Sequence, residues 1–305
     1  MPRTTARDTW LRRIQELDPE RDFEEIYRIS CAYEFPWDTT QALGMALYRT
    51  YAVPAIGGLL ARTGELTRRP QKRYDDTVLL LDASLEHGLD SPAGRQAQRR
   101  VNQMHRHYDI PDDQFRYVLA TFVVIPKRWL DDFGWRPYSP AEIRASVNYY
   151  RALGQRMNIK DIPSTYEEFE ELLDSYEREH FAFDAGGRAV SDATLALVAS
   201  WFRPFGGLMR RATICLMDDP LRESFRYPAP SALLRRLVLG GMRARGRLVR
   251  LLPPRRKPFH GRQSRRVRGY PGYPAGYRLS DLGTFPTTAH PGTSATAPDP
   301  SPPRQ

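Results

Sequence analysis

Helix-start signals recur along this chain, and they constrain its fold more than any other feature. Ser91 stands before Pro92, which places a capping residue ahead of a proline in the first helical turn. Residues 139–142 (SPAE) and 165–168 (TYEE) have the spacing of capping boxes. Residues 117–126 (YVLATFVVIP) are apolar on every side, which predicts a central buried helix. Because no other segment offers a partner strand, the sequence predicts an all-α fold.

The same patterns predict one large helical domain over residues 1–258. A tail over 259–305 follows, basic at first and then rich in proline, threonine and serine, and we expect it to be mostly disordered. We expect a buried helix over 42–61 that kinks at Pro54, and a later helix capped by Ser191. Other helices are expected to begin near residues 72, 91, 111, 139, 165 and 231.

Composition excludes several classes of protein. Two cysteines, Cys31 and Cys215, among 305 residues are too few for a disulfide framework or a cysteine-rich zinc site. No apolar run approaches the ~18 residues of a membrane-spanning helix, and the N-terminal residues show no secretory signal. Walker, G-x-G-x-x-G, G-x-S-x-G and H-E-x-x-H motifs are absent. We therefore expect a cytoplasmic protein, with or without peripheral contact with a membrane.

The basic charge lies near the C-terminus. Residues 222–305 hold 17 basic and three acidic residues, whereas residues 1–221 hold 29 basic and 33 acidic residues. Residues 235–268 hold 13 basic residues and no acidic one, interleaved at first with large apolar residues. This pattern predicts peripheral contact with an anionic membrane through residues 231–268, ahead of binding to nucleic acid. Covering an acidic face of its own domain is the remaining alternative.

Two histidines are candidates for metal ligands. His105 lies on an apolar helical stripe beside Met104 and Tyr108, and a neutral imidazole there suits a metal or haem iron. A buried histidine bonded to a carbonyl group would give the same pattern. Glu177 and His180 form a single Glu-x-x-His pair, whereas carboxylate-bridged di-iron bundles use two. A solvated helix face is the favoured interpretation of that pair.

Residues 72–77 (KRYDDT) concentrate charges and hydroxyl groups in less than two turns of helix. Arg73 and Thr77 are one turn apart and therefore neighbours on one face. Together they can hold a carboxylate or an oxygen species. A structural salt bridge from Arg73 to Asp76 or Glu65 is the simpler alternative.

Four segments resemble the MpaB/rubber-oxygenase catalytic-domain family when taken in order. They are RTGELTRRPQKRYDDT (62–77), RRVNQMHRHYDIPDDQFRYVLATFVVIPKRWLDDFGWRPYSPAE (99–142), LGQRMNIKDIP (153–163) and YERE (176–179). Later segments PAPSALLRRL and YPAGYRLSDLGTF also look similar to this family, so that the resemblance covers about residues 20–285.

The resemblance implies an all-α fold with a globin-like core, haem b as cofactor, and O₂ and a lipophilic, isoprenoid-like small molecule as substrates. His105 is similar in position to the proximal haem ligand, and Arg73 and Thr77 to the distal arginine and threonine. The rubber-cleaving branch has a lysine where this chain has Asp76, a departure that argues against rubber cleavage itself. Glu65 is a candidate for that branch's catalytic glutamate.

We therefore expect a haem b-dependent oxygenase. The predicted catalytic residues are Arg73, Asp76 and Thr77, and the predicted cofactor-binding residues are His105 (the iron ligand), Arg99 and Met104. Two alternatives remain. One is a non-haem iron oxygenase that uses Glu177 and His180, and the other is a non-catalytic helical module that binds anionic surfaces through its basic segment.

Overall fold

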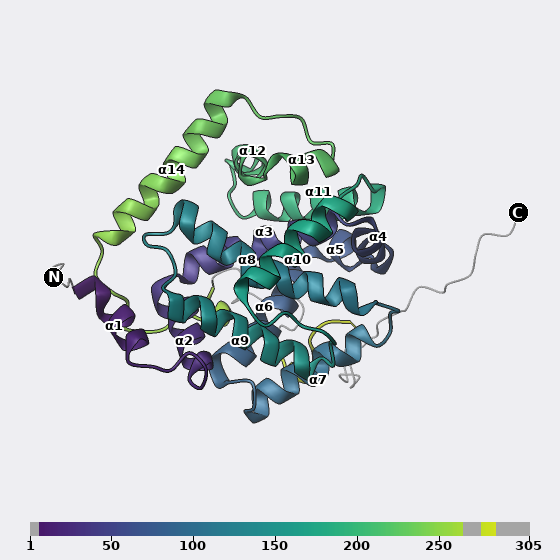
Figure 1. Ribbon diagram of the computed structural model, residues 1–305. Coiled ribbons are helices and arrows are strands. Elements are labelled where there is room, and N and C mark those ends of the chain that lie inside the picture. Colours follow the sequence, from purple (N-terminus) through teal and green to yellow (C-terminus); the bar gives the residue numbers. More distant parts are fainter. Residues whose placement is uncertain (1–5, 265–275, 285–305) are drawn as a thin grey trace, which may run out of the picture.

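Fourteen α-helices form the part of the protein that the computed structural model describes, residues 6–264 and 276–284 (Figure 1). They are α1 Thr9–Gln15, α2 Phe23–Ile29, α3 Pro36–Tyr51, α4 Pro54–Thr63, α5 Glu65–Arg68, α6 Pro70–His87, α7 Pro92–His105, α8 Asp112–Phe133, α9 Pro140–Arg156, α10 Tyr166–His180, α11 Ala185–Ser200, α12 Gly206–Leu216, α13 Asp219–Ser224 and α14 Ala232–Arg250. These residues contain no β-strand, so the prediction of an all-α fold is confirmed. The globin-like core stays a prediction.

Helix α8 is the centre of the fold, as the apolar run over 117–126 predicts. It packs against α3, α9, α10 and α14 (Figure 1). Side chains in its middle are fully buried, among them Tyr117, Ala120 and Val123. Because the middle of α8 is covered, its position fixes the helices around it.

Capping hydrogen bonds are present at three of the predicted helix starts. The Ser91 hydroxyl accepts from the backbone N–H of Gly94 at 2.9 Å, and this bond orients α7. Full capping boxes begin α9 at Ser139 and α10 at Thr165.

Two expected helix boundaries are wrong. Residues 42–61 do not form one kinked helix, because Val53 is extended before Pro54 and the chain restarts there as α4. Ser191 does not cap a helix. It is buried inside α11, which begins after Asp184, and its hydroxyl bonds the Tyr227 hydroxyl at 2.9 Å.

The described residues beyond 258 pack on the helical domain. The N–H of Phe259 donates to Ala32 O at 2.9 Å. Arg100 on α7 donates to Leu282 O at 2.7 Å, and Lys72 on α6 donates to Gly283 O at 3.0 Å. These contacts tie Phe259 to Ala32, and residues 276–284 to α6 and α7. The rest of the expected disordered tail lies outside the described residues.

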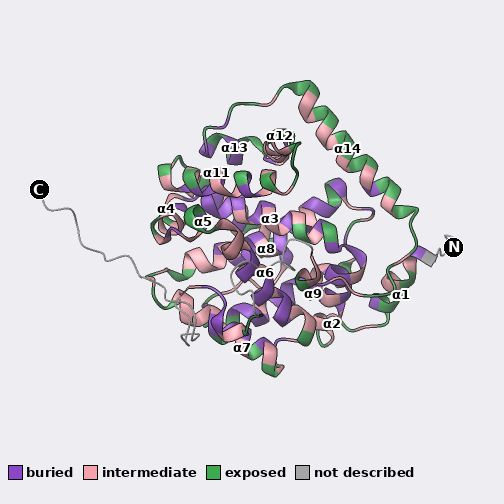
Figure 2. Cartoon of the chain, turned by 180° about the vertical axis from the view of Figure 1, so that it is seen from behind, coloured by how far each residue is buried: buried purple, intermediate pink, exposed green. Residues whose placement is uncertain are grey.

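Helix α14 runs along the edge of the molecule (Figure 1), and much of its surface is exposed (Figure 2). It touches the domain closely at Gly246, where an added Cβ would lie 2.5 Å from Phe133 O. None of the helices in the described ranges has the length and apolar content needed to cross a membrane.

Helices α4 and α11 approach each other through glycine. A Cβ added at Gly187 would lie 2.3 Å from the backbone oxygen of Tyr51, and Gly57 faces the same oxygen at the same distance. Backbone atoms cannot move aside as a flexible side chain can. This contact therefore requires glycine on both helices.

We predict that Gly187→Ala lowers the free energy of unfolding by about 1–3 kcal/mol, because the new methyl group overpacks the contact. Gly44, inside α3, has open space around its Cβ position. The matched variant Gly44→Ala is expected to leave stability unchanged or raise it by up to about 1 kcal/mol. Denaturant unfolding measures both, and equal effects would contradict the close contact.

Candidate functional site

His105 is the last residue of α7, and its ring is sequestered. It meets the Phe115 ring on α8 edge-on, with centroids 5.3 Å apart. Its Nδ1 atom is buried and makes no hydrogen bond. The alternative of a buried histidine bonded to a carbonyl group is therefore not met at Nδ1.

The His105 ring is held neutral. Burial, together with the nearby Arg73 guanidinium, lowers its pKa to about 4. At physiological pH the imidazole therefore keeps a nitrogen lone pair, which a metal ligand requires.

Arg73 and Thr77 lie one turn apart on α6 and are bonded to each other. Arg73 Nη1 donates to Thr77 Oγ1, and Thr77 Oγ1 donates to the Arg73 carbonyl oxygen at 2.8 Å. The alternative of a structural salt bridge from Arg73 is not found in the described residues. Asp76 pairs with Lys72, and Glu65 pairs with Arg69 at 2.5 Å.

The field of Arg73 reaches several groups from other elements. It lowers the pKa of His105 on α7, and it opposes the rise that burial gives to the pKa of Tyr51 on α3. Burial also raises the pKa of Tyr108. The Glu65 carboxylate adds to that rise and Arg73 opposes it. Tyr51 on α3, His105 on α7 and Tyr108 after α7 therefore lie within reach of the Arg73 charge.

Asp76 is buried, and Lys72 Nζ donates to its carboxylate at 2.7 Å. The same ammonium group holds Gly283 O, so this ion pair also fastens the C-terminal segment. Asp76 remains a predicted catalytic residue, and its immediate surroundings are those of a structural ion pair.

The adjacent carboxyl group, Asp75, was missed by sequence reasoning. It is 0% exposed, accepts one hydrogen bond from Gln71 at 2.7 Å, and has a second oxygen without a partner. Burial, together with the neighbouring Asp76, raises its pKa to about 7 although the hydrogen bond from Gln71 opposes the rise. The available signal was its spacing with Leu79 and Asp82, which lie on the buried side of α6.

The two other predicted cofactor residues have different surroundings. Arg99 is exposed on α7, whereas the adjacent Arg100 is buried and holds the C-terminal segment. Met104 packs against that segment, because a Cβ at Gly283 would lie 2.1 Å from its sulfur. Neither residue is placed against the His105 ring by a hydrogen bond or ring contact.

The solvated-face interpretation of the Glu-x-x-His pair is wrong for Glu177. This side chain is 7% exposed and is bonded by the Arg49 guanidinium at both carboxylate oxygens and by the Tyr117 hydroxyl at 3.1 Å. The His180 ring stacks on Tyr176, with centroids 4.0 Å apart. Glu177 and His180 are not part of any three-ligand metal cluster within the described ranges.

Residues 37–251 match the sequence model of a family described as "ER-bound oxygenase mpaB/B'/Rubber oxygenase, catalytic domain". The chain belongs to this family. The match includes α3 to α14, and with them Arg73, Thr77 and His105. The resemblance drawn from the sequence motifs is confirmed.

Three fungal relatives carry the name of this family. The chain is 30% identical to ER-bound oxygenase mpaB' of Penicillium brevicompactum over 217 residues, 65% of this chain and 51% of the relative. It is 30% identical to ER-bound oxygenase mpaB of Penicillium roqueforti over 222 residues, 67% of this chain and 74% of the relative. Identity to ER-bound oxygenase mpaB of P. brevicompactum is 29% over 185 residues, 55% of this chain and 47% of the relative. The chain thus spans about half the length of two of these relatives.

Asp75 leads to a pH-dependent prediction. Its pKa is raised on folding, so its contribution to stability is full below the ordinary value of 3.8 and is lost as the pH rises through about 7. Acidification from about pH 8 to about pH 5.5 should stabilise the wild type by about 2 kcal/mol more than it stabilises Asp75→Asn.

Denaturant unfolding at the two pH values measures this difference. Asp109→Asn, which changes an exposed carboxylate, is the matched control and should behave as the wild type. Identical pH dependence in wild type and Asp75→Asn would show that Asp75 ionises freely.

Proposed function

We propose that the protein is a haem b-dependent oxygenase that uses O₂ on a lipophilic substrate. Family membership and the names of the relatives support oxygenase activity. The proposal of haem rests on residues of this chain.

The observation that carries the proposal is the unpartnered Nδ1 of His105. A buried polar atom without a hydrogen bond costs about 1–3 kcal/mol, and a bound group would remove that cost. The ring is neutral, as a haem ligand requires, and it packs edge-on against the Phe115 ring. The residues therefore fit the cofactor that the resemblance implies.

When bound, haem b supplies an iron centre that binds and activates O₂. Arg73 supplies a fixed positive charge and N–H donors, which stabilise negative charge that develops on oxygen. Its bond to Thr77 sets the direction of both side chains. Phe115 covers one side of the His105 ring. Arg99 remains a candidate for pairing with a carboxylate of the cofactor, and Met104 for packing against it.

The proposed substrate class is not the rubber of the family name. Asp76 stands where the rubber-cleaving branch has lysine, and its carboxylate is neutralised by Lys72. The proposed substrate is a lipophilic small molecule, including the isoprenoid class, rather than rubber itself.

Haem stoichiometry tests this function. We predict that the protein expressed with haem precursor shows a Soret band and near-stoichiometric haem b by pyridine haemochrome assay, and that His105→Ala loses at least ~90% of it because the axial ligand is gone. His107→Ala is the matched control, since His107 is exposed and its Nδ1 faces the Gln103 carbonyl oxygen at 2.8 Å. A folded wild type that stays colourless would contradict the proposal. Iron without porphyrin that is lost in His180→Ala would favour the non-haem alternative.

We also propose that α14 docks the enzyme on an anionic membrane surface, where a lipophilic substrate dissolves. Leu233, Leu237, Leu248 and Leu251 are each more than 60% exposed and lie at helical spacing along one stripe, with the small residues 240, 241 and 244 between. Arg236, Arg243, Arg247 and Arg250 lie beside this stripe and are exposed.

This division of the exposed surface distinguishes a membrane from other partners. On a membrane, the leucines enter the interface between headgroups and acyl chains. The arginines contact anionic headgroups, and each contributes about 1 kcal/mol to the binding free energy. Nucleic acid would use the arginines alone. Residues 265–268 of the expected contact region lie outside the described residues.

Vesicle co-sedimentation tests whether α14 binds an anionic membrane surface. We predict salt-sensitive binding to vesicles of phosphatidylcholine with phosphatidylserine, reduced about 10-fold or more by Leu237→Ser/Leu248→Ser and by Arg236→Gln/Arg247→Gln. Leu208→Ser, at an exposed leucine of α12, is the matched control. Absence of vesicle binding, or binding that survives loss of the leucines, would contradict membrane docking. Duplex DNA binding lost only with the arginines would assign the surface to nucleic acid.

A further inference from the structure

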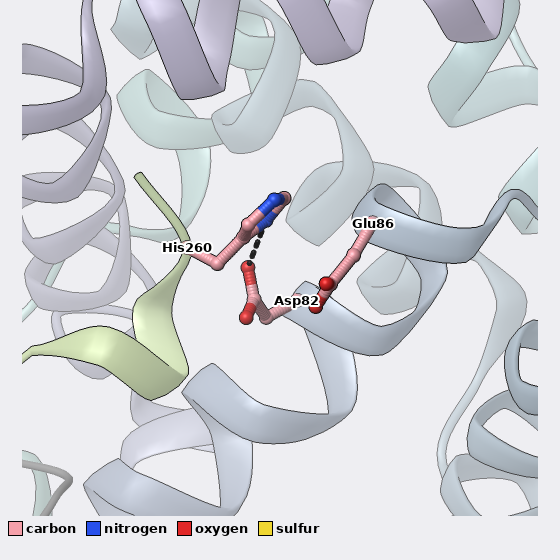
Figure 3. Close-up of side chains that lie close together, drawn as sticks. All are labelled: Asp82, Glu86 and His260. Carbon is pink, nitrogen blue, oxygen red and sulfur yellow. Dashed lines mark ion pairs between the residues drawn. The ribbon is translucent and has the colours of Figure 1, made fainter. Parts of the chain in front are cut away.

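A cluster of three potential metal ligands includes two residues of α6, Asp82 and Glu86, which lie more than one helical turn beyond Thr77. Asp82 and Glu86 are one helical turn apart, so their side chains share a face. His260, which follows α14 in the chain, points toward the same place (Figure 3). The cluster thus joins α6 to the segment that begins the C-terminal part of the chain.

The three side chains offer ligand atoms that all lie within 4.8 Å of one another, and they form the only such group of three in residues 6–264 and 276–284. His260 Nδ1 lies 3.4 Å from Asp82 Oδ1 (Figure 3). The His260 side chain belongs to a residue that is 5% exposed, and this Nδ1 atom is buried without a hydrogen bond. A buried ring nitrogen that faces the Asp82 carboxylate without a hydrogen bond, and has Glu86 nearby, is an arrangement that a cation would complete.

The donor set defines the ion. One imidazole and two carboxylates suit a first-row divalent metal such as Zn²⁺ or Mn²⁺, whereas Ca²⁺ and Mg²⁺ prefer oxygen ligands alone. We propose that Asp82, Glu86 and His260 bind a divalent transition-metal ion, which fastens the segment after α14 to α6. This site is separate from the one proposed for haem.

Arg262 contacts two of the three proposed ligand residues, Asp82 and Glu86. Its guanidinium donates to both oxygens of Glu86 at 2.7 and 2.8 Å, and its backbone N–H donates to Asp82 Oδ2 at 3.3 Å. The Arg262 side chain is half exposed and can turn to solvent when a cation takes the Glu86 carboxylate. Its positive charge opposes a cation, so removing it should tighten metal binding.

Zinc titration of the chelator-treated full chain, followed by calorimetry and by thermal unfolding, tests the proposal. We expect one zinc ion per chain at this cluster and a rise in Tm on binding. His260→Ala should weaken binding at least ~10-fold, and Arg262→Gln should strengthen it. His105→Ala should bind zinc as the wild type does.

The matched control is His87→Ala. His87 is exposed and lies 3.9 Å from Glu86, so adventitious surface chelation would depend on it and not on His260. Zinc binding lost in His87→Ala but kept in His260→Ala would overturn the proposal, as would a wild type that binds no zinc. Asp82→Asn provides a second test that keeps the side-chain size. Unchanged affinity in a folded Asp82→Asn variant would also overturn it.

Discussion

The buried polar side of α6 is the constraint on which the rest of the structure depends. A helix that carries charged groups into the interior must bring a partner to each, because an unpaired buried charge is costly. Lys72 partners Asp76 and also holds the 276–284 segment, Gln71 links Asp75 to Trp201, and Arg262 clamps Glu86. Pairing the buried polar side chains of α6 therefore requires the C-terminal part of the chain to fold back on the domain. The same helix carries Arg73, whose charge acts on His105.

Much of the fold was predictable because its signals are local. Capping boxes at Ser139 and Thr165, and the apolar content of α8, act within one helix and need no tertiary information. The failures involve long-range contacts. Ser191 looks like a helix cap, but the hydroxyl of Tyr227 is its partner. The 276–284 segment is polar and rich in turns, and only its contacts with Arg100 and Lys72 reveal that it packs.

The candidate site was predictable in part. Helical spacing placed Arg73 beside Thr77, and the family resemblance drew attention to His105. Spacing could not show that Asp76 has a lysine partner whereas Asp75 keeps an unpartnered oxygen, since both lie in the same helical turn. Glu177 was misjudged for a similar reason, because its partner Arg49 is 128 residues away in the chain. His260 joins Asp82 and Glu86 only after the chain has returned from α14.

The claim that most needs testing is that the neutral His105 ring is the ligand of a haem iron. The absorption spectrum of His105→Gly, loaded with haem and recorded with and without added imidazole, tests it most directly. The account predicts no bound-haem Soret band in the variant alone and its return when free imidazole fills the space left by the side chain. A His105→Gly spectrum identical to that of the wild type without imidazole would contradict the account.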